Sequence, residues 1–286
     1  MIYLILSIVF STSLFVIFKY FNVFKVNTLQ AIVVNYIVAF VLGIFSAGAY
    51  TKLATINAQP WMYGAVVLGF LFVTIFFVMA KTAQNNGVSV ASIAGKMSVV
   101  VPIVFGIVLY NESITILKVL GILIALIAVY LSSVKEERSN TKAGIVLPIL
   151  LFLGSGIIDT TIKYVETNFV PEDGVDFFSG SLFGFAAFFG IVILLGKQFV
   201  VKEKLEVKSV LAGLVLGVPN YYSIVFLIKA LQNKNFESST LFTINNVGVV
   251  IFSTVVGLLL FRENFSTKNK IGVGLAILGI ILVTIA

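Results

Sequence analysis

The stretch Lys81-Thr82-Ala83-Gln84-Asn85 has a second copy, Lys229-Ala230-Leu231-Gln232-Asn233, 148 residues further along the chain. The Lys, Gln and Asn positions are the same in both copies. Further on, Glu112 matches Glu263 at an offset of 151, so the second copy has gained three residues. Both copies are embedded in long apolar segments. The chain therefore consists of two related halves.

The composition is that of a protein in a bilayer. With 59% hydrophobic residues, 11% charged residues and a mean hydropathy of +1.12, the chain has too little polar surface to cover a soluble globule of 286 residues. A helix needs about 20 mostly apolar residues to cross the membrane. Because lipid offers no hydrogen-bond partners, the backbone must form helices or a closed barrel. The long apolar runs favour helices over the alternating pattern of a barrel.

Polar residues divide the chain into ten apolar segments. We expect helices at 1–20, 29–48, 61–81, 88–110, 116–133, 143–165, 176–196, 208–231, 238–261 and 269–286. The polar run at 135–140 separates two five-helix repeats, at 1–134 and 143–286. Five is an odd number, so the second repeat enters the membrane inverted. The predicted fold is an all-α integral membrane protein of ten transmembrane helices in two inverted repeats.

Inverted repeats usually carry a substrate site near the membrane midplane, at the interface between the repeats. A duplicated bundle with a purely architectural role is the alternative. Cysteine and histidine are absent from the sequence, which removes thiol nucleophiles, imidazole bases and nearly every zinc, haem or iron–sulfur site. We therefore expect no cofactor, no metal and no catalytic residue. The net charge of +7 comes from loops between apolar segments, which topology explains better than nucleic-acid binding.

Two polar turns and a closing glycine-rich helix resemble a known family. The turns are Leu109-Tyr110-Asn111-Glu112-Ser113 and Leu260-Phe261-Arg262-Glu263-Asn264, and the helix contains Gly272-Val273-Gly274-Leu275-Ala276-Ile277-Leu278-Gly279. With ten expected spans, they resemble the drug/metabolite transporter superfamily, specifically its EamA-type members. The resemblance implies a secondary transporter, most often an exporter of amino acids or other small metabolites, with a cavity formed by both halves.

Other functions fit the sequence less well. No glycine loop of the Walker type is present, so the chain must use an existing gradient or exchange. A membrane-embedded enzyme usually needs clustered carboxylates or histidines, whereas the acidic residues here are scattered. A flippase for lipids or lipid-linked sugars shares the architecture and stays open as the alternative.

Lys96 lies well inside the expected helix 88–110. A lysine at this depth costs about 3 kcal/mol, so it should face a cavity or a partner. We expect it to anchor a substrate carboxylate or phosphate, which favours anionic or zwitterionic substrates. The alternative is a structural lysine that pairs with an acidic residue or extends its stem to the membrane interface.

Other polar residues inside expected helices are further candidates for the substrate site. At the depth of Lys96, the second half has Asn245 and Asn246, which either line the site or join helices by hydrogen bonds. The residues after Pro219 are Asn220, Tyr221 and Tyr222. They form a gate or a wall of the cavity, or accompany a kink that serves packing alone. The same two readings apply to Pro102, while Asn35 and Tyr36 either line the cavity or pack.

Asp159 is the acidic residue placed well inside an expected helix, with Lys163 four residues later. Residues at this spacing lie on one helix face, so the two side chains can form an ion pair with each other. Alternatively, Asp159 carries a coupling proton or is the partner of Lys96. Glu112 and Glu263 each lead into the next helix, where a carboxylate stabilises the positive helix end, so we predict a structural role for them.

Two pairs of glycines, Gly180 with Gly184 and Gly213 with Gly217, have the spacing that allows helices to approach closely.

The distribution of basic residues bears on orientation. Those in or beside loops after odd-numbered segments outnumber those after even-numbered segments by 13 to 5, which places both termini outside the cytoplasm. The family resemblance implies cytoplasmic termini instead, so orientation stays open. We expect a multi-pass protein of the inner (cytoplasmic) membrane whose partners are a small-molecule substrate and the lipid bilayer, with a homodimer left open.

Overall fold

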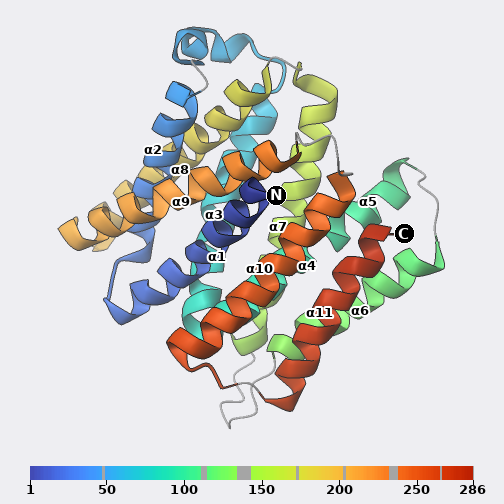
Figure 1. Ribbon diagram of the computed structural model, residues 1–286. Coiled ribbons are helices and arrows are strands. Elements are labelled where there is room, and N and C mark those ends of the chain that lie inside the picture. The colour runs from blue at the N-terminus through green and yellow to red at the C-terminus, as the bar shows by residue number, and fades with distance from the viewer. Residues whose placement is uncertain are drawn as a thin grey trace. The chain divides into compact units, whose positions relative to one another are not determined.

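A computed structural model describes the protein over residues 1–46, 49–110, 115–133, 143–171, 174–201, 204–231, 238–264 and 266–285. Within these ranges the chain is helical and contains no strand (Figure 1). The helices are α1 (Ile2–Val23), α2 (Thr28–Ser46), the 3-10 helix η1 (Ala49–Ala58), α3 (Met62–Asn86), α4 (Val88–Met97), α5 (Val100–Tyr110), α6 (Ile116–Ser133), α7 (Ala143–Phe169), α8 (Val175–Val201), α9 (Val207–Leu231), α10 (Ser238–Phe261) and α11 (Thr267–Ile285).

The expected helices match the observed ones closely, with two differences. The fourth, 88–110, is divided into α4 and α5, and η1 was not predicted. Eight helical stretches in the described residues are long and apolar enough to cross a membrane, and one of them, Val88–Phe105, runs from α4 into α5. Val119–Ser132 is a shorter apolar helix. The chain is thus an all-helical, multi-pass membrane protein, while the ten-span inverted arrangement remains a prediction.

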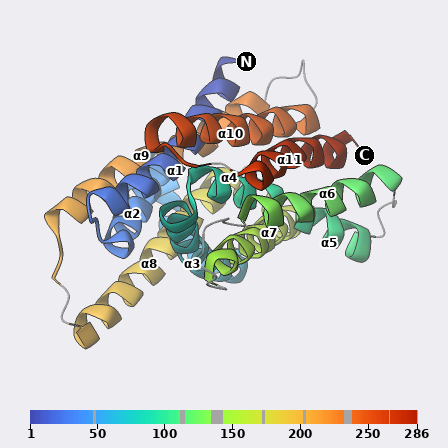
Figure 2. The same ribbon diagram turned by 90° about the horizontal axis from the view of Figure 1, so that it is seen from below.

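The helix α6 carries its large apolar side chains on the outside. Its buried positions are mostly small: Gly121, Ala125, Ala128 and Ser132. Leucine and isoleucine dominate its exposed side: Leu120, Leu123, Leu126 and Ile127. Small residues let helices approach closely inside a membrane, where lipid can cover the large apolar side chains. Accordingly, α6 packs along α11, and the two helices lie side by side in both views (Figures 1 and 2).

The glycine pairs allow close contact between helices, as predicted. On α8, Gly180 and Gly184 lie against Ile44 and Phe40 of α2. On α9, Gly213 and Gly217 lie against a second side of α2, where a methyl group added at Gly213 would come 2.6 Å from the Ala31 carbonyl oxygen. These contacts enclose α2 between α8 and α9.

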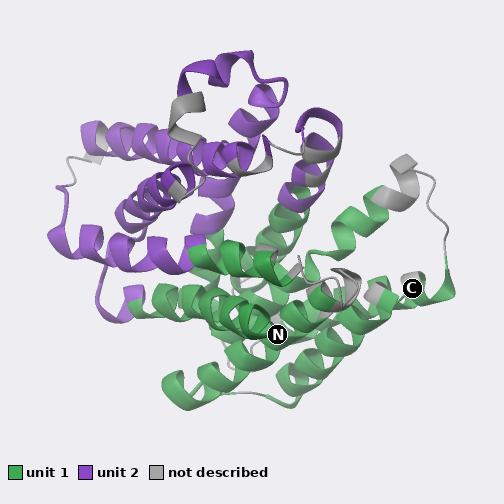
Figure 3. Cartoon of the chain, turned by 45° about the horizontal axis from the view of Figure 1, so that its top comes forward, with its two compact units in different colours: residues 1–20, 78–157, 222–286 green, residues 21–77, 158–221 purple. Residues whose placement is uncertain are grey.

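Residues in contact divide the chain into two compact units, coloured separately in Figure 3. Unit 1 comprises 1–20, 78–157 and 222–286, and unit 2 comprises 21–77 and 158–221. Each unit therefore contains segments from both halves of the sequence. The division describes packing and leaves the predicted repeats at 1–134 and 143–286 untested.

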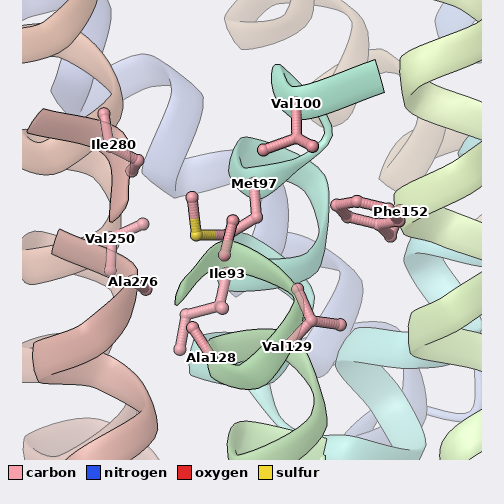
Figure 4. Close-up of a cluster of buried hydrophobic side chains, with 10 residues drawn as sticks. Ile93, Met97, Val100, Ala128, Val129, Phe152, Val250, Ala276 and Ile280 are labelled. Carbon is pink, nitrogen blue, oxygen red and sulfur yellow. The ribbon is translucent and has the colours of Figure 1, made fainter. Parts of the chain in front are cut away.

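Each unit has its own apolar core. In unit 1, Ile93 and Met97 of α4 pack in a cluster with Val250 of α10, Ala276 of α11 and Phe152 of α7 (Figure 4). In unit 2, the buried Trp61 ring lies 5.3 Å from the rings of both Phe177 and Phe178, measured between centroids. The first of these cores fixes the position of α4, which carries Lys96.

Candidate functional site

The fourth expected helix is interrupted at its midpoint. Ser98 and Val99 form a turn between α4 and α5. Pro102, in the first turn of α5, lacks the N–H that would bond the Ser98 carbonyl in a continuous helix. The Val101 N–H instead donates to that carbonyl oxygen at 2.9 Å. The sequence left Pro102 open as part of a gate or as a packing kink. In the structure it lies in the first turn of α5, directly after the interruption.

Lys96 lies two residues before this turn. It is half-buried and is the basic residue in the last turn of α4. A cation near a helix C-terminus interacts favourably with the helix dipole. The positive end of α5 begins directly after the turn, at Val100. A helix C-terminus, an ammonium group and a helix N-terminus therefore occur within five residues of chain.

One face of α4 carries three polar residues, Ser89, Ser92 and Lys96, spaced so that they lie in line along the helix. This face packs on α10, which runs antiparallel to α4. Near the start of α4, a methyl group added at Gly257 would lie 2.8 Å from the Ser89 hydroxyl oxygen. One turn further, the Ser253 hydroxyl donates a 2.5 Å hydrogen bond to the Ser92 hydroxyl.

Asn246 extends this line toward the interruption. It lies seven residues before Ser253, on the face of α10 that also carries Val250, which packs in the α4 core. Since the helices are antiparallel and rise about 1.5 Å per residue, Asn246 is level with the turn at Val99. We call Ser89, Ser92 and Lys96 of α4, with Asn246 and Ser253 of α10, the polar seam.

Glu263 closes one end of the polar seam. Its carboxylate accepts the Val88 N–H at 2.7 Å and the Ser89 hydroxyl at 3.1 Å. It therefore stabilises the N-terminus of α4, 175 residues away in the sequence. Glu263 has the expected structural role, but it caps α4 and not α11, the helix that follows it in the sequence. The N-terminus of α11 is capped instead by hydrogen bonds between Ser266 and Asn269. Glu112 lies outside the described residues.

Replacing Glu263 with Ala should lower stability without removing the fold. The Val88 N–H would lose its acceptor, and loss of a helix cap costs about 1 kcal/mol, or about 2–4 °C in a chain of this size. The measurement is thermal unfolding of the purified protein in detergent. Asn264→Ala, at the exposed neighbouring position, is the control. Equal midpoints for the two variants would contradict a capping role for Glu263.

The two asparagines of α10 face different neighbours. Asn245 is 1% exposed, and within the described residues its Oδ1 has no hydrogen-bond partner. It shares a side of α10 with Leu241 and Gly248, which contact Leu4 and Ile8 of α1. Asn246 instead shares the α4 side. The structure therefore brings Lys96 and Asn246 onto one seam and turns Asn245 toward α1.

The candidates on α9 lie on a continuous helix that includes Pro219. Asn220 is buried and Tyr221 is half-buried, and both belong to unit 2. Tyr222 belongs to unit 1, where its ring stacks on Phe226 with 5.6 Å between centroids and lies 6.2 Å from the Phe10 ring. Tyr222 thus takes part in an aromatic cluster between α1 and α9.

Asp159 is exposed on α7, in unit 2. The side chain of Lys163 lies outside the described residues, so the predicted pairing between these two residues stays a prediction. The same holds for the pairing of Asp159 with Lys96.

Comparison with known proteins identifies the family of the first half. Residues 1–134 match the EamA-like transporter family. The resemblance to EamA-type members of the drug/metabolite transporter superfamily is thereby confirmed. An uncharacterised protein of Haemophilus influenzae is 27% identical over 280 residues, which cover 94% of this chain and 93% of that protein. A solved crystal structure shares the fold with a TM-score of 0.56 at 14% identity, covering 98% of this chain and 97% of that one.

Sequence reasoning missed several parts of this candidate site. Ser92 and Ser253 were not among the predicted site residues, and the hydrogen bond between them spans 161 positions. The spacing of Ser89, Ser92 and Lys96 on one helix face was a signal that could have been read. No signal in the sequence pointed from Glu263 to Val88.

Proposed function

We propose that the protein is a secondary transporter of small polar metabolites, such as anionic or zwitterionic amino acids, that works by alternating access in the inner membrane. The observation that carries this proposal is the interruption of a membrane helix at its midpoint, beside Lys96 and level with Asn246. Transporters commonly bind substrates where interrupted helices expose their ends near the midplane. The match of residues 1–134 to a transporter family supports the same function.

Three pairs of antiparallel helices support the inverted repeat. Helices that correspond in the two halves pack against each other: α2 on α8, α4 on α10 and α6 on α11. In the last pair, Gly272 lies on Ser132 and Gly279 on Ala125, so the helices run in opposite directions. Helices related by a two-fold axis in the membrane plane would meet in this antiparallel way. We therefore extend the EamA-like assignment from 1–134 to 143–286.

The chemistry beside the turn suits an acidic group. The Lys96 ammonium and the positive end of α5 favour a carboxylate, and a charge-assisted hydrogen bond is about twice as strong as a neutral one. Asn246 offers a neutral amide at the same level. In this proposal Asn245, Asn220, Tyr221 and Tyr222 are further candidates to bind substrate, and Asp159 is the candidate to carry the coupling proton.

The polar seam is also a gate in this proposal. Within the described residues, α10 packs on α4. The Ser92–Ser253 and Ser89–Glu263 hydrogen bonds join the two halves on the side where α4 begins. The structure then corresponds to the state closed on this side, and transport requires the seam to open.

Flux into proteoliposomes tests the proposal. The purified protein should carry radiolabelled L-aspartate or L-alanine faster than L-lysine, and an imposed pH gradient should accelerate uptake. Protein-free liposomes provide the background. Absence of flux for all three amino acids would contradict the proposed substrate class. Exchange of fluorescent phospholipids between leaflets, without amino-acid flux, would replace it with the flippase alternative.

A further inference from the structure

Asn35 on α2 is a fully buried polar residue that the proposed mechanism does not use. Its exposed fraction is 0%, and neither its Oδ1 nor its Nδ2 has a hydrogen-bond partner within the described residues. An unpaired buried polar group is costly, and in a native structure it calls for an explanation. Here both halves of one amide are unpaired.

The neighbours of Asn35 place it beside a close helix contact within unit 2. One side of α2, with Ala31, Val34 and Val38, packs on the glycines of α9. Another side, with Phe40 and Ile44, packs on the glycines of α8. Asn35 lies at the edge of the first of these surfaces, where its backbone carbonyl oxygen would be 3.0 Å from a methyl group added at Gly217. It borders the side that carries Ile32, Tyr36 and Ala39, which are at most 1% exposed.

The side chain of the next residue, Tyr36, has a hydrogen-bond partner, in contrast to Asn35. The Tyr36 hydroxyl donates to the Phe72 carbonyl at 2.9 Å. Its ring lies 5.4 Å from the Phe76 ring and 6.2 Å from the Phe183 ring, measured between centroids. Within the described part of the chain, these aromatic rings and the apolar side chains beside Asn35 offer no hydrogen bond to the amide, so a group from outside the chain would satisfy it.

We infer that Asn35 binds the carboxamide group of a small ligand. A carboxamide places an N–H donor beside a carbonyl acceptor and can pair with both atoms of the Asn35 amide. A carboxylate of the same shape lacks the donor and would leave the Asn35 oxygen unpaired. Because Asn35 is fully buried, the ligand reaches it when the helices of unit 2 part. The inference goes beyond the proposed function and does not depend on Lys96.

Stability of the ligand-free protein provides the first test. Replacing Asn35 with Leu puts an apolar side chain of similar size in an apolar site, so the thermal unfolding midpoint in detergent should rise by about 2–4 °C. Tyr36→Phe, which removes a satisfied hydroxyl one residue away, should lower it. A fall in the midpoint of Asn35→Leu would show that the amide is bonded within the protein and would overturn the inference.

Ligand binding provides the second test. The probes are L-glutamine and nicotinamide, each compared with its acid, L-glutamate and nicotinate. We expect at least one carboxamide, and not its acid, to raise the midpoint of the wild-type protein by about 5 °C at a 100-fold excess over its Kd. Asn35→Leu should abolish this shift, and Lys229→Met should keep it.

The outcomes of the binding test separate the two proposals. No response of the wild-type protein to either carboxamide, or a response that survives in Asn35→Leu, overturns the assignment of Asn35. Amino-acid flux in the same preparation would then leave the proposed function standing. A response that depends on Asn35, in a protein without flux, supports this inference and contradicts transport.

Discussion

Transport by a Lys96→Met protein is expected to fall at least about 30-fold, because losing one partner of a buried, hydrogen-bonded charge pair costs about 2 kcal/mol or more. Stability should not fall, since a lysine inside a membrane helix costs about 3 kcal/mol and methionine has a similar length without the charge. The measurement is initial flux of the best amino-acid substrate into proteoliposomes, together with the thermal unfolding midpoint.

Two further lysine variants make this result specific. Lys96→Arg keeps the positive charge and should retain part of the flux. Lys229→Met removes a charge from an exposed lysine whose Nζ lies 5.6 Å from the centre of the Tyr3 ring, and it should transport normally. Unchanged flux in Lys96→Met would remove Lys96 from the substrate site. Loss of folded protein would instead assign it to the stability of α4.

A disulfide across the polar seam is expected to stop transport reversibly. Ser92 and Ser253 have hydroxyl oxygens 2.5 Å apart, a spacing close to that needed for two bonded sulfur atoms. The chain contains no cysteine, so Ser92→Cys with Ser253→Cys forms no competing bond. Under oxidising conditions flux should fall to the background of protein-free liposomes, and a reducing agent should restore it.

A second cysteine pair provides the matched control. Ala125→Cys with Gly279→Cys joins α6 to α11, where a methyl group at Gly279 would lie 3.5 Å from the Ala125 Cα atom. This pair lies outside the polar seam, so its oxidation should leave flux unchanged. Full transport with the Ser92–Ser253 bond formed would show that the seam stays closed throughout the cycle, and the gate would have to lie elsewhere.

Several features of the fold could be predicted because they depend on local properties of the chain. The length and apolarity of each segment predicted the helices, although the single helix expected at 88–110 is divided into α4 and α5. The spacing of Gly213 and Gly217 predicted a close helix contact, since a missing side chain leaves room whichever helix fills it. Lys96 could be predicted as a candidate site residue from local properties too, because a charge inside an apolar segment is costly in any membrane fold.

Other features depend on which helix faces meet. The spacing of residues along a helix shows which side chains share a face, but the partner of that face is chosen by packing over the whole chain. Only the tertiary structure places Glu263 on the first turn of α4, 175 positions away, and Ser253 on Ser92. Only the tertiary structure shows that the Asn35 amide has no partner in the described residues, because an unpaired group is defined by every neighbour around it.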